Sequence, residues 1–191
     1  MTDAHPPAKA RSSSSLQGAH VILVGLPGAG KSFFGRAVSK VVNREFLDFD
    51  REIERRTGKS VAGIFAHEGE AAFRARELAL TRELSAAPAM LISPGGGWVT
   101  IPGVMDLVRP PSRIIHLRIS TEAALDRLSR SRVVRPLVKM DDPRAAIEQI
   151  WADRAELYGL ADEVIDVESV DSQQVIQIVA SLARNLTTGL G

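Results

Sequence analysis

The sequence predicts a three-layer α/β fold in which helices flank a five-stranded parallel sheet. Short apolar runs alternate along the chain with longer stretches of helical periodicity, an order that is typical of strands joined by helices. The runs are apolar throughout instead of alternating, as expected for a parallel sheet that is covered on both faces. The expected strands are residues 20–24, 45–50, 89–93, 113–119 and 163–167.

Composition indicates a single globular domain over residues 19–191, preceded by a disordered leader. The leader, residues 1–18, is rich in serine, proline and alanine and has no continuous apolar stretch, so it is not a secretory signal. The 191-residue chain has a net charge of +1, which gives no support for nucleic acid or an anionic membrane as partner. It has no cysteine, and no apolar run approaches the roughly 18 residues of a membrane span. We expect a cytoplasmic monomer.

A phosphate-binding loop follows the first expected strand. Residues 25–32 read G-x-x-x-x-G-K-S, and glycines in such a loop let several backbone N–H groups converge on one anion. Lys31 brings a positive charge to the β- and γ-phosphates, and the Ser32 hydroxyl can ligate Mg²⁺. Helical periodicity over residues 31–42 places a helix N-terminus behind the loop, which also favours an anion. The motif predicts that this P-loop binds a nucleoside triphosphate.

Two aspartates at the end of the second run are expected beside this loop, because ligands of parallel sheets bind beyond the carboxyl ends of the strands. Asp48 and Asp50 are spaced i, i+2 and would share a face if the strand stays regular. One carboxylate can hold the Mg²⁺ shell, while the other orients or deprotonates an attacking hydroxyl. A pair of solvated acids that caps the next helix is the alternative.

The next helices are expected over residues 51–56 and 61–86, the second interrupted near Gly69. Arg74 and Glu77 are spaced i, i+3 on the second helix and are close enough to pair. A surface ion pair is the more ordinary interpretation of such a spacing. Local sequence alone leaves both interpretations open.

Three glycines, Gly95 to Gly97, come directly after the third expected strand. They indicate a close approach of a ligand to backbone N–H groups, with a flexible turn as the alternative. Residues 102–108 are expected to form a short helix with a proline in its first turn. Ser120 is expected to cap a helix that runs to about residue 129.

A basic stretch follows this helix and contains Arg130, Arg132 and Arg135. Such runs are usually solvated, but in a phosphoryl-transfer enzyme a mobile arginine that closes over the phosphates stabilises transition-state charge. We therefore interpret residues 130–142 as a lid. The remaining expected helices are residues 143–157, which contain the otherwise unremarkable Arg154, and 172–186.

Taken in order, these motifs resemble the shikimate kinase family, a small group within the nucleoside-monophosphate-kinase-like P-loop phosphotransferases. The resemblance runs from about residue 19 to residue 186 without obvious large gaps. Single motifs are weak, but their order and spacing are highly specific. They are G-L-P-G-A-G-K-S (25–32), L-D-F-D (47–50), R-T-G-K-S (56–60), I-F-A-H-E-G-E-A-A-F-R-A-R-E (64–77), G-G-G (95–97), V-R-P-L (134–137) and R-A-E-L-Y (154–158).

The resemblance implies transfer of the γ-phosphate of ATP to the 3-hydroxyl of shikimate, with Mg²⁺ as cofactor. It implies catalytic roles for Lys31, Asp50 and the lid residue Arg135, and a magnesium site with Ser32 as ligand and Asp48 nearby. The implied ATP-binding residues are Gly28, Ala29, Gly30, Lys31, Ser32, Phe33 and Arg135. The implied shikimate-binding residues are Asp50, Arg74, Glu77, Gly95, Gly96, Gly97 and Arg154, the arginines as a grip on the carboxylate.

Three departures from the family pattern bear on the site. Phe33 stands where the family usually has threonine, so a hydroxyl contact is lost and we expect weaker ATP binding. Pro94 and Trp98 flank the glycines where smaller or aliphatic residues are common, and Trp98 either narrows the acceptor pocket or packs beneath it. No arginine follows the last strand near the adenine, where Arg127 is a partial substitute.

Two other functions stay open from the sequence. One is a related small kinase with another acceptor, such as gluconate or a nucleoside monophosphate, although a nucleotide would need a base pocket that the sequence does not reveal. The other is a kinase-like module that senses shikimate-like acids or ATP without efficient turnover. Phe33 and Trp98 motivate this second idea, while the intact Lys31, Asp50 and Arg135 oppose it.

Overall fold

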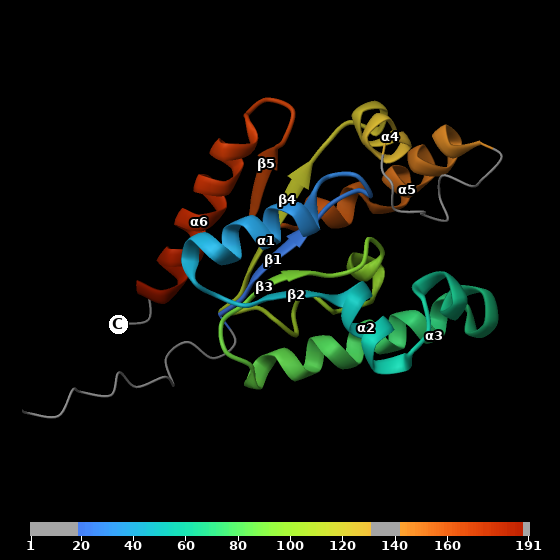
Figure 1. Cartoon of the computed structure of the whole chain (residues 1–191), viewed down its shortest axis with the longest axis horizontal. Coiled ribbons are helices and arrows are strands. Elements are labelled where there is room, and N and C mark those ends of the chain that lie inside the picture. Colours follow the sequence, from blue (N-terminus) through green and yellow to red (C-terminus); the bar gives the residue numbers. More distant parts are fainter. Residues whose placement is uncertain (1–18, 131–141, 189–191) are drawn as a thin grey trace, which may run out of the picture.

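The computed structural model describes residues 19–130 and 142–188, so the expected leader and nearly all of the expected lid lie outside the described residues. At its centre is a five-stranded sheet in the order β2-β3-β1-β4-β5, in which each pair of neighbours is parallel (Figure 1). This arrangement confirms the fold class that the sequence predicts. The strands are β1 (Val21–Val24), β2 (Phe46–Asp48), β3 (Leu91–Ser93), β4 (Arg113–Arg118) and β5 (Glu163–Asp166).

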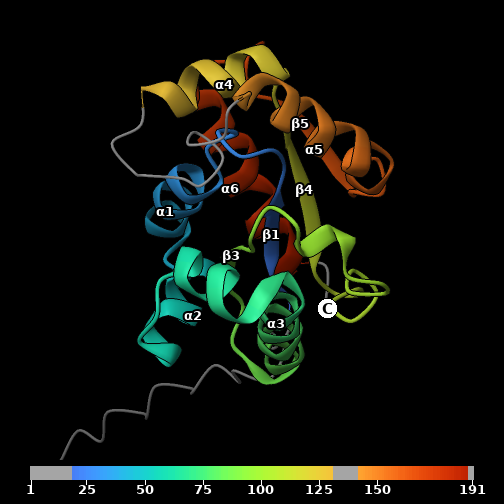
Figure 2. The ribbon, with the colours of Figure 1, turned by 90° about the vertical axis from the view of Figure 1, so that its right-hand side faces the viewer.

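Helices cover both faces of the sheet (Figures 1 and 2). Helix α1 packs against α6 on one face, while α3 and α5 lie over the other, and α2 packs against α3. Because both faces are covered, all four residues of β1 are buried, which explains its uninterrupted apolar sequence. The helices are α1 (Lys31–Val42), α2 (Phe49–Thr57), α3 (Val61–Glu83), α4 (Thr121–Ser129), α5 (Pro143–Tyr158) and α6 (Ser172–Thr188), with short 3₁₀ turns η2 (Leu84–Ala86) and η3 (Trp98–Thr100).

The helix starts follow local side-chain chemistry. The Ser120 hydroxyl accepts a hydrogen bond from the N–H of Ala123 and caps α4, as the sequence predicts. Asp142 caps α5 in the same way, and Pro143 occupies the first turn, where its missing N–H costs nothing. Helix α3 is interrupted at Gly69, whose φ of 82° and ψ of 169° are not helical. The predicted interruption near Gly69 is thereby confirmed.

Two local predictions were wrong. Strand β2 ends at Asp48 instead of Asp50, because the Asp48 carboxylate accepts a hydrogen bond from the N–H of Arg51 and starts α2. The expected helix over residues 102–108 is a series of turns, and Gly103 has a φ of 69° that breaks helical geometry after the first residue. Within the two described ranges, no helix combines the length and the apolar character that crossing a bilayer requires.

Candidate active site

A cavity of about 230 Å³ lies at the carboxyl edge of the sheet, between the P-loop and the glycine turn after β3. Segments far apart in sequence meet here, as the position of ligands in parallel sheets predicts. Its lining comprises Pro27, Gly28, Gly30, Lys31, Ser32, Phe33, Asp48, Asp50, Ser93, Pro94, Gly96, Arg127 and Leu128.

The P-loop has a backbone conformation that requires glycine. Gly28 and Gly30 have φ values of 90° and 91°, in the left-handed region that other residues rarely adopt. A Cβ on Gly28 would also lie 2.8 Å from the Ala124 carbonyl oxygen of α4. The Lys31 ammonium donates hydrogen bonds to the carbonyls of Gly25 (2.8 Å) and Leu26 (3.1 Å), so a cation stands at the N-terminus of α1.

Ser32 and Asp48 lie side by side at the edge of the cavity. The Ser32 hydroxyl donates a hydrogen bond of 2.7 Å to Oδ2 of Asp48, and Arg36 Nη2 lies 3.8 Å from the same oxygen. The pair therefore presents a hydroxyl and a carboxylate oxygen next to the phosphate-binding loop. These are the hard oxygen donors that magnesium prefers.

Asp50 faces the cavity from the first turn of α2, not from a strand, so the regular-strand geometry expected for Asp48 and Asp50 does not hold. Both carboxylates nevertheless line the cavity, because the helix begins between them. Asp50 Oδ1 lies only 3.0 Å from the position that a Cβ on Gly95 would take. The glycine turn and the start of α2 therefore touch each other across the site.

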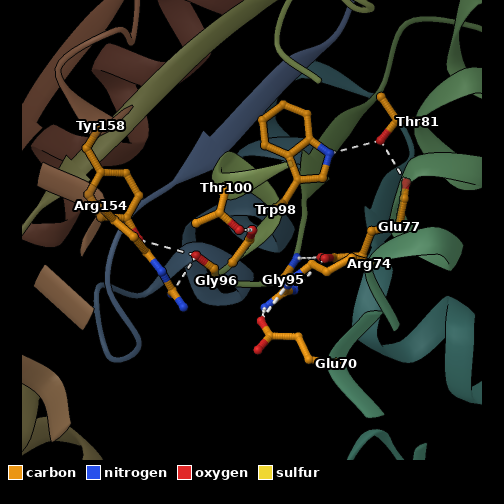
Figure 3. A network of polar contacts seen from close by, with 11 residues as sticks. Glu70, Arg74, Glu77, Thr81, Gly95, Gly96, Trp98, Thr100, Arg154 and Tyr158 are labelled. Atoms are coloured by element: carbon orange, nitrogen blue, oxygen red, sulfur yellow. Dashed lines mark hydrogen bonds and ion pairs between the residues drawn. The ribbon is translucent and has the colours of Figure 1, made fainter. Parts of the chain in front are cut away.

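Arg74 and Glu77 form an ion pair that is largely withdrawn from solvent (Figure 3). Arg74 Nη1 donates to Glu77 Oε2 at 2.5 Å, and the Glu77 side chain is completely buried. Glu77 Oε1 accepts a hydrogen bond of 2.9 Å from the N–H of Gly95. Burial raises the pKa of the Glu77 carboxyl, the charge of Arg74 opposes this shift, and the charge of Asp50 adds to it. Arg74 and Glu77 therefore do not form the ordinary surface ion pair that their spacing alone favours.

The glycine turn holds two arginines by close approach of its backbone. A Cβ on Gly97 would overlap the guanidinium of Arg74, and a Cβ on Gly95 would lie 2.5 Å from Glu77 Oε1. The Gly96 carbonyl accepts a hydrogen bond of 2.8 Å from Arg154 Nη1 (Figure 3), so the turn contacts both arginines. A side chain at Gly95 or Gly97 would therefore displace Glu77 or Arg74 from its present position.

Comparison with known proteins decides the family. The profile of the family described as Shikimate kinase matches residues 27–184. The chain is 38% identical to a shikimate kinase of Pseudomonas aeruginosa (strain LESB58), with 87% of this chain and 97% of the relative covered. It is 41% identical to that of Halorhodospira halophila, with 76% and 82% covered.

The chain belongs to the shikimate kinase family. A solved structure described as shikimate kinase from Acinetobacter baumannii in complex with shikimate has a TM-score of 0.77 and 29% identity to it, with 93% of this chain and 98% of that chain covered. Members of the shikimate kinase family are ATP-dependent kinases, and the P-loop geometry described above agrees with that chemistry.

The residues that depart from the shikimate kinase pattern differ in how they lie relative to the cavity. Trp98 is buried outside the cavity lining, and its indole N–H donates to Thr81 Oγ1 at 2.9 Å, so it packs beneath the turn and does not narrow the cavity. Phe33 is 61% exposed at the cavity rim, and the weaker ATP binding expected from it stays a prediction. Arg127 lines the cavity, and its role as a partial substitute for the family's arginine near the adenine stays a prediction. Arg135 lies outside the described residues.

Sequence reasoning gave no role to Tyr158, which contacts the glycine turn, or to His116, which stacks on Tyr158. The Tyr158 hydroxyl donates to the Gly96 carbonyl at 3.4 Å, and burial raises the pKa of this hydroxyl, which keeps it a donor. His116 of β4 stacks on the Tyr158 ring at 4.8 Å between centroids. The spacing of Tyr158, one helical turn after Arg154, could have indicated that the two side chains lie on the same face of α5. His116 lies in a mostly apolar strand, and its sequence context gives no comparable indication.

Proposed function

We propose that the chain transfers the γ-phosphate of ATP to the 3-hydroxyl of shikimate, giving shikimate 3-phosphate and ADP. One observation carries the proposal beyond family membership: Arg74 and Arg154 both contact the turn of Gly95–Gly97, and this turn also borders the P-loop cavity. Two guanidinium groups can bind one carboxylate through paired N–H donors, a geometry that lysine cannot offer. The acceptor's carboxylate would thus be held while its hydroxyl faces the nucleotide.

The nucleotide side needs a cation that can change partners. Lys31 donates to two carbonyls of its own loop, and charged phosphate oxygens would be stronger acceptors for its ammonium than these neutral carbonyls. Magnesium would take Ser32 as ligand and Asp48 as a nearby carboxylate, and it would neutralise charge on the phosphates. No group of three or more metal-binding side chains forms among the described residues, so phosphates and water would supply its other ligands.

Asp50 is the carboxylate that would orient or deprotonate the attacking hydroxyl. It lines the cavity, whereas Glu77 is fully buried, bound to Arg74 and hydrogen-bonded to Gly95. Glu77 therefore positions Arg74 in this proposal, while Asp50 faces the reacting groups. Phosphoryl transfer needs in-line placement and neutralised charge more than covalent help, and Arg135 would add the lid cation.

The test is ADP release with ATP and Mg²⁺, compared for shikimate, quinate, gluconate, CMP and no acceptor. We expect strong stimulation by shikimate alone. Stimulation by gluconate or CMP instead would assign the same fold to a different acceptor. Saturable shikimate binding without turnover would favour a sensing module. Monomeric state and a cytoplasmic location stay predictions, which sedimentation and cell fractionation can test.

A further inference from the structure

We propose that Glu70 is a positioning residue for the acceptor's carboxylate, because it sets the orientation of the Arg74 guanidinium. The proposal rests on the proposed function and adds a residue to its acceptor site. Glu70 is the first residue after the non-helical Gly69, one helical turn before Arg74. A single oxygen of Glu70 accepts from two nitrogens of Arg74, from Nε at 3.1 Å and from Nη2 at 2.6 Å (Figure 3).

The donors of Arg74 divide in a way that suits a carboxylate. A guanidinium has five N–H groups, one on Nε and two on each Nη. Glu70 takes the Nε–H and one Nη2–H, and Glu77 takes one Nη1–H. No contact within the described residues takes the other two N–H groups, one on each Nη, so both can donate to a carboxylate. Glu70 thus occupies the Nε–Nη2 edge of the guanidinium and leaves other N–H donors for an incoming anion.

Glu77 alone would not fix the guanidinium plane. One contact to Nη1 lets the planar group pivot about that contact as the side-chain torsions change, whereas a second contact at Nε and Nη2 fixes the plane. The plane matters because the guanidinium lies directly against Gly97, with the rings of Phe65 and Phe73 at 5.9 and 5.6 Å from Cζ. A rotated guanidinium would meet these neighbours and present its free donors in another direction.

The location of Glu70 suits a positioning role that does not support the core. Its side chain is 59% exposed, and Arg74 keeps its contact with Glu77 when Glu70 is replaced, so the fold should persist. At the first turn after the interruption, a carboxylate is also favoured by the helix dipole. Glu68 on the same helix offers a matched comparison, because it pairs with Lys59 and Arg76 and not with Arg74.

The experiment measures kcat and KM of the full chain for shikimate and for its neutral methyl ester, in wild type, Glu70→Gln, Glu70→Ala and Glu68→Gln. We expect the KM for shikimate to rise about tenfold in Glu70→Ala and less in Glu70→Gln, whose amide oxygen still accepts a hydrogen bond. The KM for ATP and the kcat at saturating shikimate should stay near wild type. The preference for shikimate over the ester should shrink by the same factor as KM rises, because only the acid uses the aligned fork.

Equal losses for shikimate and its ester in the Glu70 variants would overturn the inference, because a general structural effect does not distinguish the two acceptors. An unchanged KM for shikimate would overturn it as well, as would the same loss in Glu68→Gln. If wild type itself shows no shikimate-dependent ADP release, the proposed function fails and this inference fails with it. Thermal unfolding of each variant verifies that folding is intact.

Discussion

Asp50 and Glu77 show how environment separates two neighbouring carboxylates of one site. Both approach the Gly95 backbone, but Glu77 is buried with a guanidinium and an amide N–H, whereas Asp50 lines the cavity. The negative charge of Asp50 contributes to the raised pKa of Glu77, so the two groups are electrostatically coupled. A carboxylate that faces a cavity can meet a substrate hydroxyl, and a buried ion pair cannot.

Replacing Asp50 with asparagine should therefore lower kcat by roughly 100-fold or more, because the amide cannot accept the hydroxyl proton. ATP binding should survive, since the substitution leaves the P-loop glycines, Lys31 and Ser32 unchanged. Steady-state ADP release and a nucleotide-binding titration would be measured on the same preparation. Turnover equal to wild type would contradict the role given to Asp50.

At the level of elements, the glycine turn between β3 and η3 connects the two halves of the acceptor site. Gly97 has a φ of −97° and a ψ of 4°, which other residues adopt without strain, so its requirement for glycine comes only from the guanidinium against it. Gly96 differs, because a Cβ there would meet Arg154 Nη1 at an ordinary 3.4 Å. Alanine substitutions at Gly96 and Gly97 can therefore be compared to separate a steric effect on the arginines from a loss of backbone flexibility.

Gly97→Ala should raise the KM for shikimate by about tenfold or more, because Arg74 must move away from the new methyl group. Gly96→Ala should have a clearly smaller effect, and neither variant should change the KM for ATP severalfold. Initial-rate kinetics with each substrate varied in turn would check this. A larger loss in Gly96→Ala than in Gly97→Ala would contradict the steric argument.

The sequence predicts elements better than it predicts contacts between them. The P-loop is recognisable because its glycines, lysine and serine have fixed spacing, and its strand and helix follow as expected. The end of β2 was missed because Asp48 is equally suited to a strand end and a helix cap. The anchoring of Arg74 by Glu70 is an ordinary i, i+4 pair in sequence, and only the fold shows that it lies against Gly97.

For the whole molecule, two buried histidines couple folding to pH: His20 directly before β1 and His116 on β4. Nδ1 of His20 accepts from the N–H of Met90 and Nε2 donates to the Leu84 carbonyl, so the ring is bound as the neutral form. Burial lowers the pKa of His20. Burial, with the charges of Arg118 and Lys31, lowers the pKa of His116 to about 4. In the unfolded chain, both histidines would have a pKa of about 6.5.

The free energy of unfolding should therefore fall as pH drops below about 6.5 towards 4, because the unfolded state then binds more protons than the folded state. Urea unfolding at a series of pH values would measure this slope. His116→Phe keeps a ring for the stack with Tyr158 and removes a titrating group, so the slope should become shallower. His67→Asn, at an exposed position of α3, is the control. An equal slope in His116→Phe and wild type would contradict the argument.

The buried packing of Trp98 beneath the glycine turn also gives the protein an internal fluorophore. The chain has two tryptophans: Trp98 directly follows Gly97, the glycine that the Arg74 guanidinium lies against, and Trp151 lies one turn before Arg154 on α5. Shikimate added without nucleotide should change the emission of Trp98, and a Trp151→Phe variant would isolate that signal. An emission that stays constant at saturating shikimate would show that the turn does not respond to its ligand. An emission that changes with shikimate would allow acceptor binding to be followed optically, without a label and without turnover.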